Sequence, residues 1–431
     1  MERDGMVANS IDSEFVRSNF PALSKEFNGR PAIFFDGPGG TQVCRQSIRA
    51  VADYFENRCA NGGGTFETSR RTDETVLTAR HAMADLLNAP AAENIVFGAN
   101  MTTLTFHLAH SFAETIRPGD EIVVTTLDHD ANVTPWTDMA RRGAVIRTVD
   151  IDPSNCTLDP NAFDVVLSER TRLVAVTHAS NAVGTIPDVA EITRRAHRVG
   201  ALVFVDAVQY VPHGPVDVQA LDCDFLACSA YKFFGPHVGV VYGKLEHLER
   251  LTPDKVRPSS NLVPWRWETG TPNYEGIAGV HGAVDYFAEI GERFGEAYRS
   301  PALFAGYSGR RLTLKAAMGA IREYESTLAE RLLDGLGTVP GIHIYGLTDR
   351  ARLHERGATV AFTLEGRKPR DIAAALAGKN IYCWSGNYYA LRLMERLGLE
   401  PDGAVRIGLV HYNTVDEIDA LIASLKEIMA L

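Results

Sequence analysis

The sequence predicts an α/β fold built on a mostly parallel sheet of seven strands, with helices on both faces and a smaller C-terminal α/β domain. Three observations lead to this prediction. With 431 residues and a hydrophobic content of 45%, the chain can bury a substantial core. From residue 72 onward, short apolar runs alternate with stretches of helical spacing. Strands that alternate with helices form parallel sheets that are covered on both faces.

Seven short apolar runs are the candidate strands of this sheet. The run at 201–205 contains no Gly or Pro, as expected of a strand buried on both faces. The run at 238–242 follows its predecessor too closely for a helical crossover, so we expect it to be antiparallel. The seven runs are 95–97, 122–126, 144–149, 173–177, 201–205, 225–228 and 238–242.

A second, smaller set of strands is predicted near the C-terminus, and the last helix is expected to begin at Thr414. The Thr414 hydroxyl and Glu417, three residues on, have the spacing of a capping box. The C-terminal strands are predicted at 359–364, 381–384 and 405–409, and further helices at 10–20, 46–58, 75–87, 104–115, 278–290 and 312–336. These elements divide the chain into an N-terminal segment (1–30) that packs on the small domain, a large domain (31–295) and a small C-terminal domain (296–431).

Composition argues against several classes of protein. The formal net charge of -11 and the pI near 5.7 leave no broad basic surface for nucleic acid. No apolar run approaches the roughly 18 to 20 residues that span a bilayer. The opening residues, MERDGMVANS, lack a signal-peptide core. We therefore expect a cytoplasmic protein that uses no membrane. Six scattered cysteines with no CxxC pair predict neither a metal site nor a disulfide framework.

Polar side chains gather where the predicted strands end. Ligands of open α/β sheets bind outside the carboxyl ends of the strands, so residues at these ends are candidates for chemistry. A helix start offers free N–H groups to a phosphate, although an ordinary threonine N-cap is the simpler explanation of that feature alone. Five successive strand ends carry, in order, a helix start at Thr102 and Thr103, then His129, then Asn181, then Asp206 with Gln209, and finally Lys232 between Ser229, Tyr231 and a Gly-Pro turn.

Six motifs carry a resemblance to a known family. They are DHDAN at 128–132, THASNAVGT at 177–185, VDAVQ at 205–209, SAYKFFGP at 229–236, ETGTPN at 268–273 and VRIGLVHYNT at 405–414. From about residue 34 to its C-terminus the chain resembles the class V aminotransferases, which are fold-type I enzymes that use pyridoxal 5'-phosphate. The likeness is greatest to the cysteine desulfurase and selenocysteine lyase branch.

The resemblance implies a set of residues that hold the cofactor. Lys232 would bind it covalently and move protons at the substrate carbons, which requires an amine with a pKa well below the usual 10.4. Asp206 would pair with the pyridine nitrogen, and His129 would stack on the ring and act as an acid or base. The remaining contacts implied are Asn181 and Gln209 to the phenolic oxygen, and Thr102, Thr103, Ser229, Tyr231 and the partner subunit's Thr271 to the phosphate.

The resemblance also implies an amino-acid substrate and an obligate homodimer. Arg406 would grip the α-carboxylate of the substrate as a bidentate fork, and Asn387 would be a further substrate contact. Thr271 belongs to a segment that reaches the neighbouring subunit's site in this family. A second glycine cluster begins a polar stretch, 62–71, that we interpret as either a loop over the pocket or an ordinary surface loop.

Two positions depart from the desulfurase pattern. Desulfurases carry a sulfur-accepting cysteine on a loop before the arginine, and alignment of that loop places Tyr389 there. Cys383 lies several residues too early and is predicted to be a packed thiol. Tyr231 also replaces a histidine that is usual in desulfurases.

We therefore expect cleavage of a C–S or C–Se bond at the β-carbon, by direct elimination if no thiol takes the sulfur and with a sulfur-acceptor protein if relay occurs. The alternatives are transamination, epimerisation or kynureninase-like cleavage on the same fold. A cofactor-binding regulator without turnover is a different class. It is disfavoured because the roughly 30 residues ahead of the fold are too few for a DNA-binding module.

Overall fold

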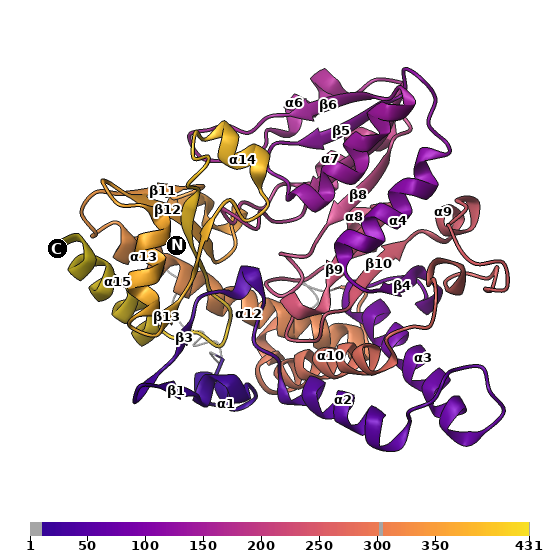
Figure 1. The fold of residues 1–431 in the computed structure, drawn as a ribbon, viewed down its shortest axis with the longest axis horizontal. Helices are drawn as coiled ribbons and strands as arrows, with labels where there is room; N and C mark the ends of the chain where they lie inside the picture. Colours follow the sequence, from indigo (N-terminus) through magenta and orange to yellow (C-terminus); the bar gives the residue numbers. More distant parts are fainter. Residues whose placement is uncertain (1–10, 301–304, 431) are drawn as a thin grey trace.

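The architecture is an α/β fold with a seven-stranded sheet and a separate four-stranded sheet, seen at the right and left of Figure 1 in a computed structural model that describes residues 11–300 and 305–430. The larger sheet has the strand order β4-β10-β9-β8-β7-β5-β6. Its strands are β4 (Ile95–Gly98), β5 (Glu121–Thr125), β6 (Val145–Val149), β7 (Thr171–Thr177), β8 (Leu202–Asp206), β9 (Phe225–Ser229) and β10 (Gly239–Gly243). All seven predicted strands are confirmed, and β10 is antiparallel to both of its neighbours as predicted.

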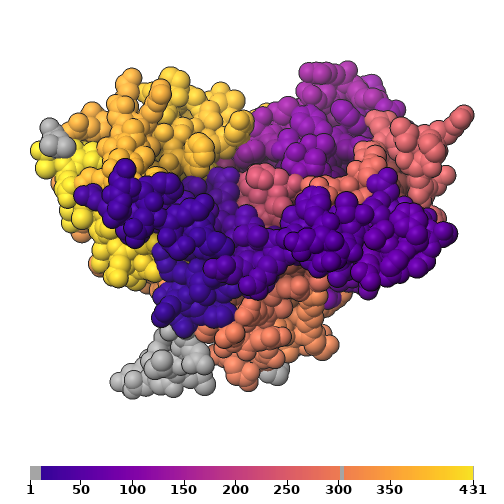
Figure 2. Space-filling view, turned by 60° about the horizontal axis from the view of Figure 1, so that its bottom comes forward, coloured from indigo at the N-terminus to yellow at the C-terminus, as the bar shows by residue number. Residues whose placement is uncertain are grey.

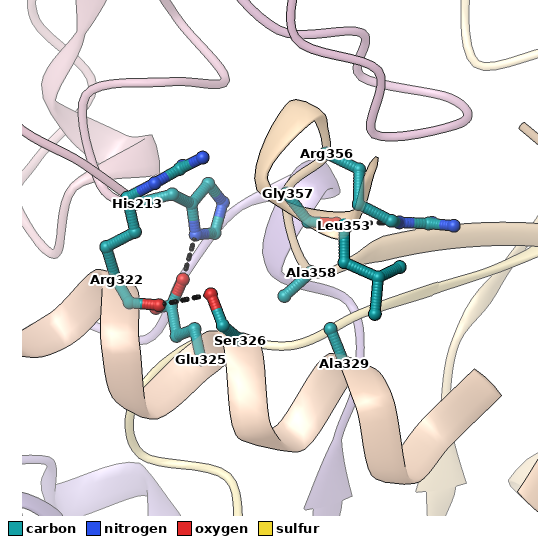
Figure 3. A pocket seen from close by; sticks show the side chains of 9 residues that line it. All are labelled: His213, Arg322, Glu325, Ser326, Ala329, Leu353, Arg356, Gly357 and Ala358. Carbon is teal, nitrogen blue, oxygen red and sulfur yellow. Dashed lines mark hydrogen bonds and ion pairs between the residues drawn. The ribbon is translucent and has the colours of Figure 1, made fainter. Parts of the chain in front are cut away.

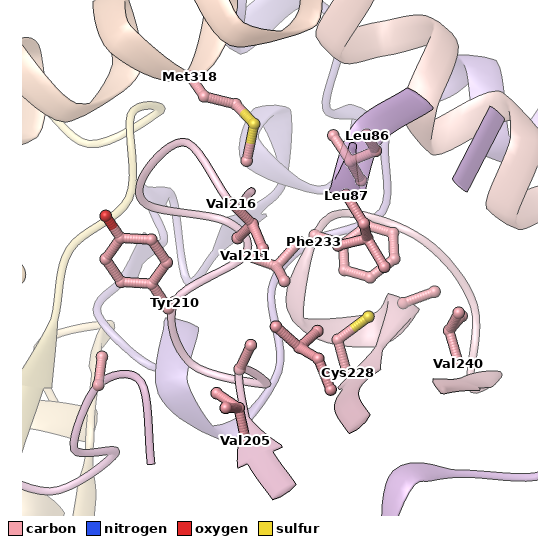
Figure 4. Close-up of a cluster of buried hydrophobic side chains, with 14 of the residues drawn as sticks. Leu86, Leu87, Val205, Tyr210, Val211, Val216, Cys228, Phe233, Val240 and Met318 are labelled. Carbon is pink, nitrogen blue, oxygen red and sulfur yellow. The ribbon is translucent and has the colours of Figure 1, made fainter. Parts of the chain in front are cut away.

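Both faces of the central strands of this sheet are buried, so successive side chains of β8 enter different cores. Val203 and Val205 of β8 join one cluster, whereas Phe204 between them joins another. Figure 4 shows the first cluster, where Val205 and Cys228 lie beneath residues such as Leu87 and Met318. This cluster includes residues of α3 (Glu67–Leu87), α10 (Tyr274–Phe294) and α12 (Gly309–Leu336), and the second includes residues of α4 (Met101–Ala113) and α5 (Thr134–Thr137).

The smaller sheet is antiparallel and differs from the sequence prediction in two ways. Its order is β11-β12-β15-β14, made of β11 (Ile342–Tyr345), β12 (Thr359–Leu364), β15 (Ala404–Gly408) and β14 (Trp384–Gly386). The prediction missed β11, a four-residue edge strand with no buried residue, whose apolar signal is weak. The strand predicted at 381–384 is two strands, because β13 (Ile381–Tyr382) pairs with β3 (Ile33–Phe34) and β14 pairs with β15. Helices α13 (Pro369–Ala377) and α15 (Val415–Ala430) pack with this sheet.

The N-terminal segment contacts both halves of the molecule. Arg17 of α1 (Ser13–Ser18) donates to the Tyr412 carbonyl and to Glu417, each at 2.8 Å. Phe20 packs edge-on against Phe234 and Tyr412. Figure 2 shows this segment, in indigo, in front of both the yellow C-terminal part and the middle of the chain. The division into three parts stays a prediction, and residues 1–10 of its first part lie outside the described residues.

Two local predictions have opposite outcomes. The capping box is confirmed, because Glu417 N–H donates to the Thr414 hydroxyl at 3.3 Å and Thr414 N–H donates to the Glu417 carboxylate at 3.2 Å. The loop predicted at 62–71 is wrong from Glu67 onward, since α3 begins there. Glu67 accepts from Arg71 at 2.9 Å, an i,i+4 pair that supports a first helical turn.

Within residues 11–300 and 305–430, no helix is long and apolar enough to cross a membrane.

Candidate active site

A cavity of about 940 Å³ opens at the carboxyl ends of the strands of the larger sheet, between this sheet and the β14–β15 region. It is the place where parallel sheets bind ligands. Ten of the twelve predicted site residues line it: Thr102, His129, Asn181, Asp206, Gln209, Ser229, Tyr231, Lys232, Asn387 and Arg406. Thr103 and Thr271 lie outside it, and so do residues 62–71. In the part of the chain that the structure describes, no three His, Cys, Asp or Glu side chains gather as a metal site.

Lys232 follows β9 in a short 3₁₀ turn, and only 8% of it is exposed. Its Nζ donates to the Pro38 carbonyl and lies 4.5 Å from the centre of the Tyr231 ring. Burial and, second to it, the nearby cationic Arg406 lower the pKa of Lys232 to about 7. A substantial share of this amine is therefore uncharged at neutral pH, as a nucleophilic lysine requires.

Two carboxylates lie near this lysine. Asp206, at the end of β8, is buried, and its Oδ1 accepts from the Val208 N–H at 2.9 Å. Burial raises the pKa of Asp206 to about 6 and that of Asp36 to about 6 as well, while Lys232 opposes both shifts. The sequence prediction missed Asp36. The same signal that found Asp206, an acid at the end of an apolar run, was available for it.

His129 is a neutral imidazole whose tautomer is fixed by the backbone. Its Nδ1 accepts from the Ala131 N–H at 3.0 Å, so the ring proton is on Nε2. Burial lowers the pKa of His129 to about 4, and the Lys232 ammonium contributes to this shift. The ring can therefore stack on a flat ligand or donate from Nε2 near neutral pH.

Arg406 lies in β15 and reaches the cavity from the smaller sheet. Its Nη1 donates to the Asn181 carbonyl at 2.8 Å, and the guanidinium carbon is 4.2 Å from the centre of the Tyr388 ring. Nε of Arg406 is buried and has no partner among the described residues. Because an unpaired buried guanidinium N–H is costly, this group is available to a carboxylate.

The start of α4 offers fewer free N–H groups to an anion than predicted. Two first-turn N–H groups of α4 are already used, since Met101 donates to Ser229 Oγ at 3.0 Å and Thr103 donates to Asn100 Oδ1 at 2.9 Å. Among the described residues, the Thr102 N–H has no acceptor, which leaves it free for a ligand anion. The Thr103 hydroxyl also bonds to Asn100, at 3.0 Å, so Thr103 caps the helix.

Two buried amide oxygens at the cavity wall have no partner within residues 11–300 and 305–430. They are Oδ1 of Asn181 and Oε1 of Gln209. Buried polar atoms of native proteins are nearly always hydrogen-bonded, so these atoms point to a ligand that completes them. The residues present fit pyridoxal phosphate: a lysine for its aldehyde, an acid for its ring nitrogen, two amide side chains whose N–H groups can donate to its ring oxygen, and the Thr102 N–H for its phosphate.

The loop after β14 covers the cavity from one side. Tyr388 and Tyr389 both have a φ of +58°, a left-handed conformation that is uncommon for residues other than Gly. The Tyr389 ring is 74% exposed and faces His129, and the Tyr389 N–H donates to Asn387 Oδ1 at 3.1 Å. The sequence prediction did not include Trp384 and Tyr388 among the site residues, although both line the cavity.

Comparison with known proteins agrees with this geometry. The family model for aminotransferase class-V matches residues 33–309 and 301–421. The chain belongs to the class-V aminotransferase family. A cysteine desulfurase of Dickeya dadantii is 34% identical over 96% of this chain and 96% of its own length. One from Pectobacterium atrosepticum is 32% identical over 98% and 99% of the two chains.

Solved structures extend the likeness to three dimensions. The crystal structure of a cysteine desulfurase from Escherichia coli has a TM-score of 0.81 and 27% identity, and it covers 97% of this chain and 99% of that one. The apo structure of a cysteine desulfurase from Thermococcus onnurineus has a TM-score of 0.83 and 26% identity, with 97% and 98% covered. The predicted family and the predicted fold-type I architecture are confirmed.

Proposed function

We propose that this class-V family member is a pyridoxal phosphate-dependent, cysteine desulfurase-like enzyme that breaks a C–S or related bond at the β-carbon of an amino acid. The single observation that carries the proposal is that a buried lysine and a buried arginine share one cavity. Lys232 has a lowered pKa, and Arg406 has an unpaired Nε. The first suits a carbonyl cofactor and the second suits an α-carboxylate. The names of the relatives at 32–34% identity supply the reaction class.

Each residue then has a task that its surroundings support. Lys232 would hold the cofactor covalently, and Asp206 would keep a proton on the pyridine nitrogen. Thr102, Ser229 and Tyr231 would hold the phosphate, together with the partner subunit's Thr271. When bound, the cofactor supplies the electron sink that weakens the bonds at the substrate carbons. Arg406 orients the substrate, with Asn387 beside it, and Lys232 takes and returns the proton at Cα.

The sulfur leaves this site without a protein thiol. The family resemblance aligns Tyr389 with the cysteine of desulfurases, and Cys383 is not among the residues that line the cavity. Burial raises the pKa of the Cys383 thiol to about 12, so it is protonated at neutral pH and is a poor nucleophile. The proposed reaction is therefore direct elimination: cysteine and water give pyruvate, ammonia and sulfide.

A homodimer is part of the proposal. Thr271 is exposed and outside its own chain's cavity, so it can reach a partner's site. The residues just before it are fixed, because the buried Glu268 pairs with Arg80. Sedimentation of the cofactor-loaded protein should give the mass of two chains, and a monomer that retains cofactor would overturn this part.

The test of the reaction is a product analysis with L-cysteine and a reductant. Pyruvate, ammonia and sulfide in equal amounts would support direct elimination. Alanine with sulfide would instead establish desulfuration with relay, and Cys383→Ser would then be the next variant to test. If no product forms while cysteine still perturbs the cofactor spectrum, cysteine is not the substrate and the proposed bond cleavage is wrong.

A further inference from the structure

A buried series of polar contacts, which joins Gln209, His213 and Glu325, leads away from the cavity wall. Gln209, whose amide borders the cavity, has its Nε2 3.4 Å from Nε2 of His213. The other ring nitrogen of His213, Nδ1, is 2.7 Å from Oε2 of Glu325 in the middle of α12. Figure 3 shows the contact between His213 and Glu325 beside Arg322 and Ser326. The chain thus joins the loop after β8 to a helix that leads into the smaller sheet.

All three members are buried, with 5%, 4% and 3% of Gln209, His213 and Glu325 exposed. Burial alone would raise the pKa of Glu325, but its contacts with His213 and His411 outweigh this and hold the pKa below its usual value. The carboxylate is therefore ionised, and it is an acceptor only. A buried carboxylate is costly unless a hydrogen-bond donor satisfies it, so Glu325 needs the N–H of His213.

The carboxylate determines which nitrogen of His213 carries the proton. Because Glu325 Oε2 can only accept, Nδ1 of His213 must be the donor across 2.7 Å. Nε2 of His213 faces Nε2 of Gln209 at 3.4 Å, and with a neutral ring it accepts the amide N–H. One orientation of the Gln209 amide follows. Its Oε1, which has no partner among the described residues, and its second N–H are the groups left for the cavity.

Few other charged groups face the contacts among Gln209, His213 and Glu325. Arg322, from the same helix, and Arg356, after η9 (Arg350–Glu355), line the small cavity that His213 and Glu325 share. His411, after β15, has its Nδ1 3.7 Å from Glu325 Oε1, which is beyond hydrogen-bond distance. Tyr286 of α10 bonds to the far side of His411 at 2.6 Å. Of these groups, only His213 contacts Gln209 through a polar atom.

We propose that Glu325, acting through His213, is a positioning residue that fixes the orientation of the Gln209 amide toward the cofactor. The inference rests on the proposed function, because Gln209 is expected to bond the ring oxygen of pyridoxal phosphate. Without the carboxylate, the ring of His213 can hold its proton on either nitrogen. A proton on Nε2 would oppose the Gln209 N–H, and the amide would then turn over.

The experiment is a double-mutant cycle on the full chain, with Glu325→Gln and Gln209→Ala made singly and together. Glu325→Gln keeps the shape of the side chain. It should shift the visible absorption maximum of the cofactor-loaded protein and weaken binding of pyridoxal phosphate by about tenfold, the equivalent of one hydrogen bond. In the Gln209→Ala background the same change should alter neither quantity. His213→Asn, which removes the link itself, should reproduce the Glu325→Gln shift.

Tyr286→Phe is the matched control. It removes the buried hydrogen bond between Tyr286 and His411, and His411 is separated from Glu325 by 3.7 Å. It should lower the Tm and leave the spectrum unchanged. If Glu325→Gln weakens cofactor binding equally in both backgrounds, or leaves the spectrum unchanged, then Glu325 is merely structural and the inference is wrong. If Glu325→Gln does not fold, His213→Asn decides by the same two criteria.

A protein that takes up no pyridoxal phosphate would overturn the proposed function without deciding this inference. The cycle is then measured as the free energy of unfolding of the cofactor-free protein. Coupling between Glu325 and Gln209 would support the proposal that Glu325 fixes the Gln209 amide, and additive effects of the two changes would overturn that proposal.

Discussion

The imidazole of His129 and the ring of Tyr389 face each other across the mouth of the cavity, with their centroids 5.6 Å apart and their planes 31° from parallel. The backbone strengthens this contact, because the Asp130 N–H donates to the Tyr389 carbonyl at 2.7 Å. The loop that the family resemblance aligns with the cysteine loop of desulfurases is therefore docked against His129, and it carries the Tyr389 phenol. A phenol that faces a neutral imidazole can cover a bound ring, but it cannot take a sulfur atom.

Replacing Tyr389 by Cys should give the protein a thiol that can take the sulfur atom from the substrate. The loop already lies over His129, so the new thiol would stand at the cavity mouth, where it is exposed enough to be deprotonated. With L-cysteine, we expect alanine to replace pyruvate and the protein to gain the mass of one sulfur atom per chain. Product analysis and intact-protein mass spectrometry measure the two results.

Tyr389→Ser is the matched control for this change. It opens the mouth of the cavity equally but provides no sulfur nucleophile, so its product should remain pyruvate. An unchanged product from Tyr389→Cys, with cofactor bound, would contradict the idea that the missing thiol alone decides the outcome.

Two buried lysines allow a paired test of the cofactor attachment. Burial lowers the pKa of both Lys232 and Lys315 to about 7, but only Lys232 lines the cavity. Lys315 donates to the backbone carbonyls of Leu86 and Val216. Lys232→Ala should abolish the visible absorption of the bound cofactor and reduce turnover by at least about a thousandfold. Lys315→Met should lower the Tm and keep the absorption. The assignment fails if the band survives in Lys232→Ala.

The pKa of Lys232 also predicts a pH dependence. Covalent attachment needs the uncharged amine, so attachment of pyridoxal phosphate to the cofactor-free protein should rise with pH and be half-maximal near pH 7. Burial is the main cause of the lowered pKa, and Arg406 is the second. Arg406→Gln removes a positive neighbour, so the midpoint should move to higher pH, by about one unit. Stopped-flow absorbance over a pH series measures it, and a midpoint that moves to lower pH would contradict the electrostatic argument.

The larger sheet and most of the cavity could be predicted because their signals are local. Buried strands such as β8 are short apolar runs, and the rule that ligands bind at strand ends turns their neighbours Asp206 and Lys232 into site residues. Thr103 is a different case. Its N–H and hydroxyl are both used by Asn100, and a sequence does not show which first-turn donor a cap consumes.

The positions that escaped prediction depend on contacts between distant segments. The Gln209–His213–Glu325 chain joins a loop to a helix more than a hundred residues later, and nothing in either segment alone marks the pair. Likewise, residues 381–382 leave the smaller sheet because β3, from the start of the chain, lies beside them. Periodicity reports which face of a segment is buried, but it does not report the partner.

The anchor of the 268–273 segment gives the last prediction. Arg80 and Glu268 form a bidentate ion pair with contacts of 2.7 and 2.6 Å, and their side chains are only 3% and 5% exposed. Glu268 also accepts from the Phe97 N–H at 2.7 Å, so it joins α3, β4 and the segment that ends near Thr271. Glu268→Ala leaves the buried Arg80 guanidinium without a carboxylate and with the Ile95 carbonyl as its acceptor, and it should cost about 3–5 kcal/mol of unfolding free energy.

Denaturant unfolding of Glu268→Ala and of the exposed-pair variant Asp419→Ala measures the difference. The Arg331–Asp419 pair is about half exposed on both sides, so losing it should cost no more than about 1 kcal/mol. Glu268→Ala should in addition weaken the proposed dimer, because it would free the backbone before Thr271, the residue that we propose reaches the partner subunit. Equal losses of stability in the two variants would mean that the Arg80–Glu268 pair is hydrated in solution, and the segment would then need another anchor.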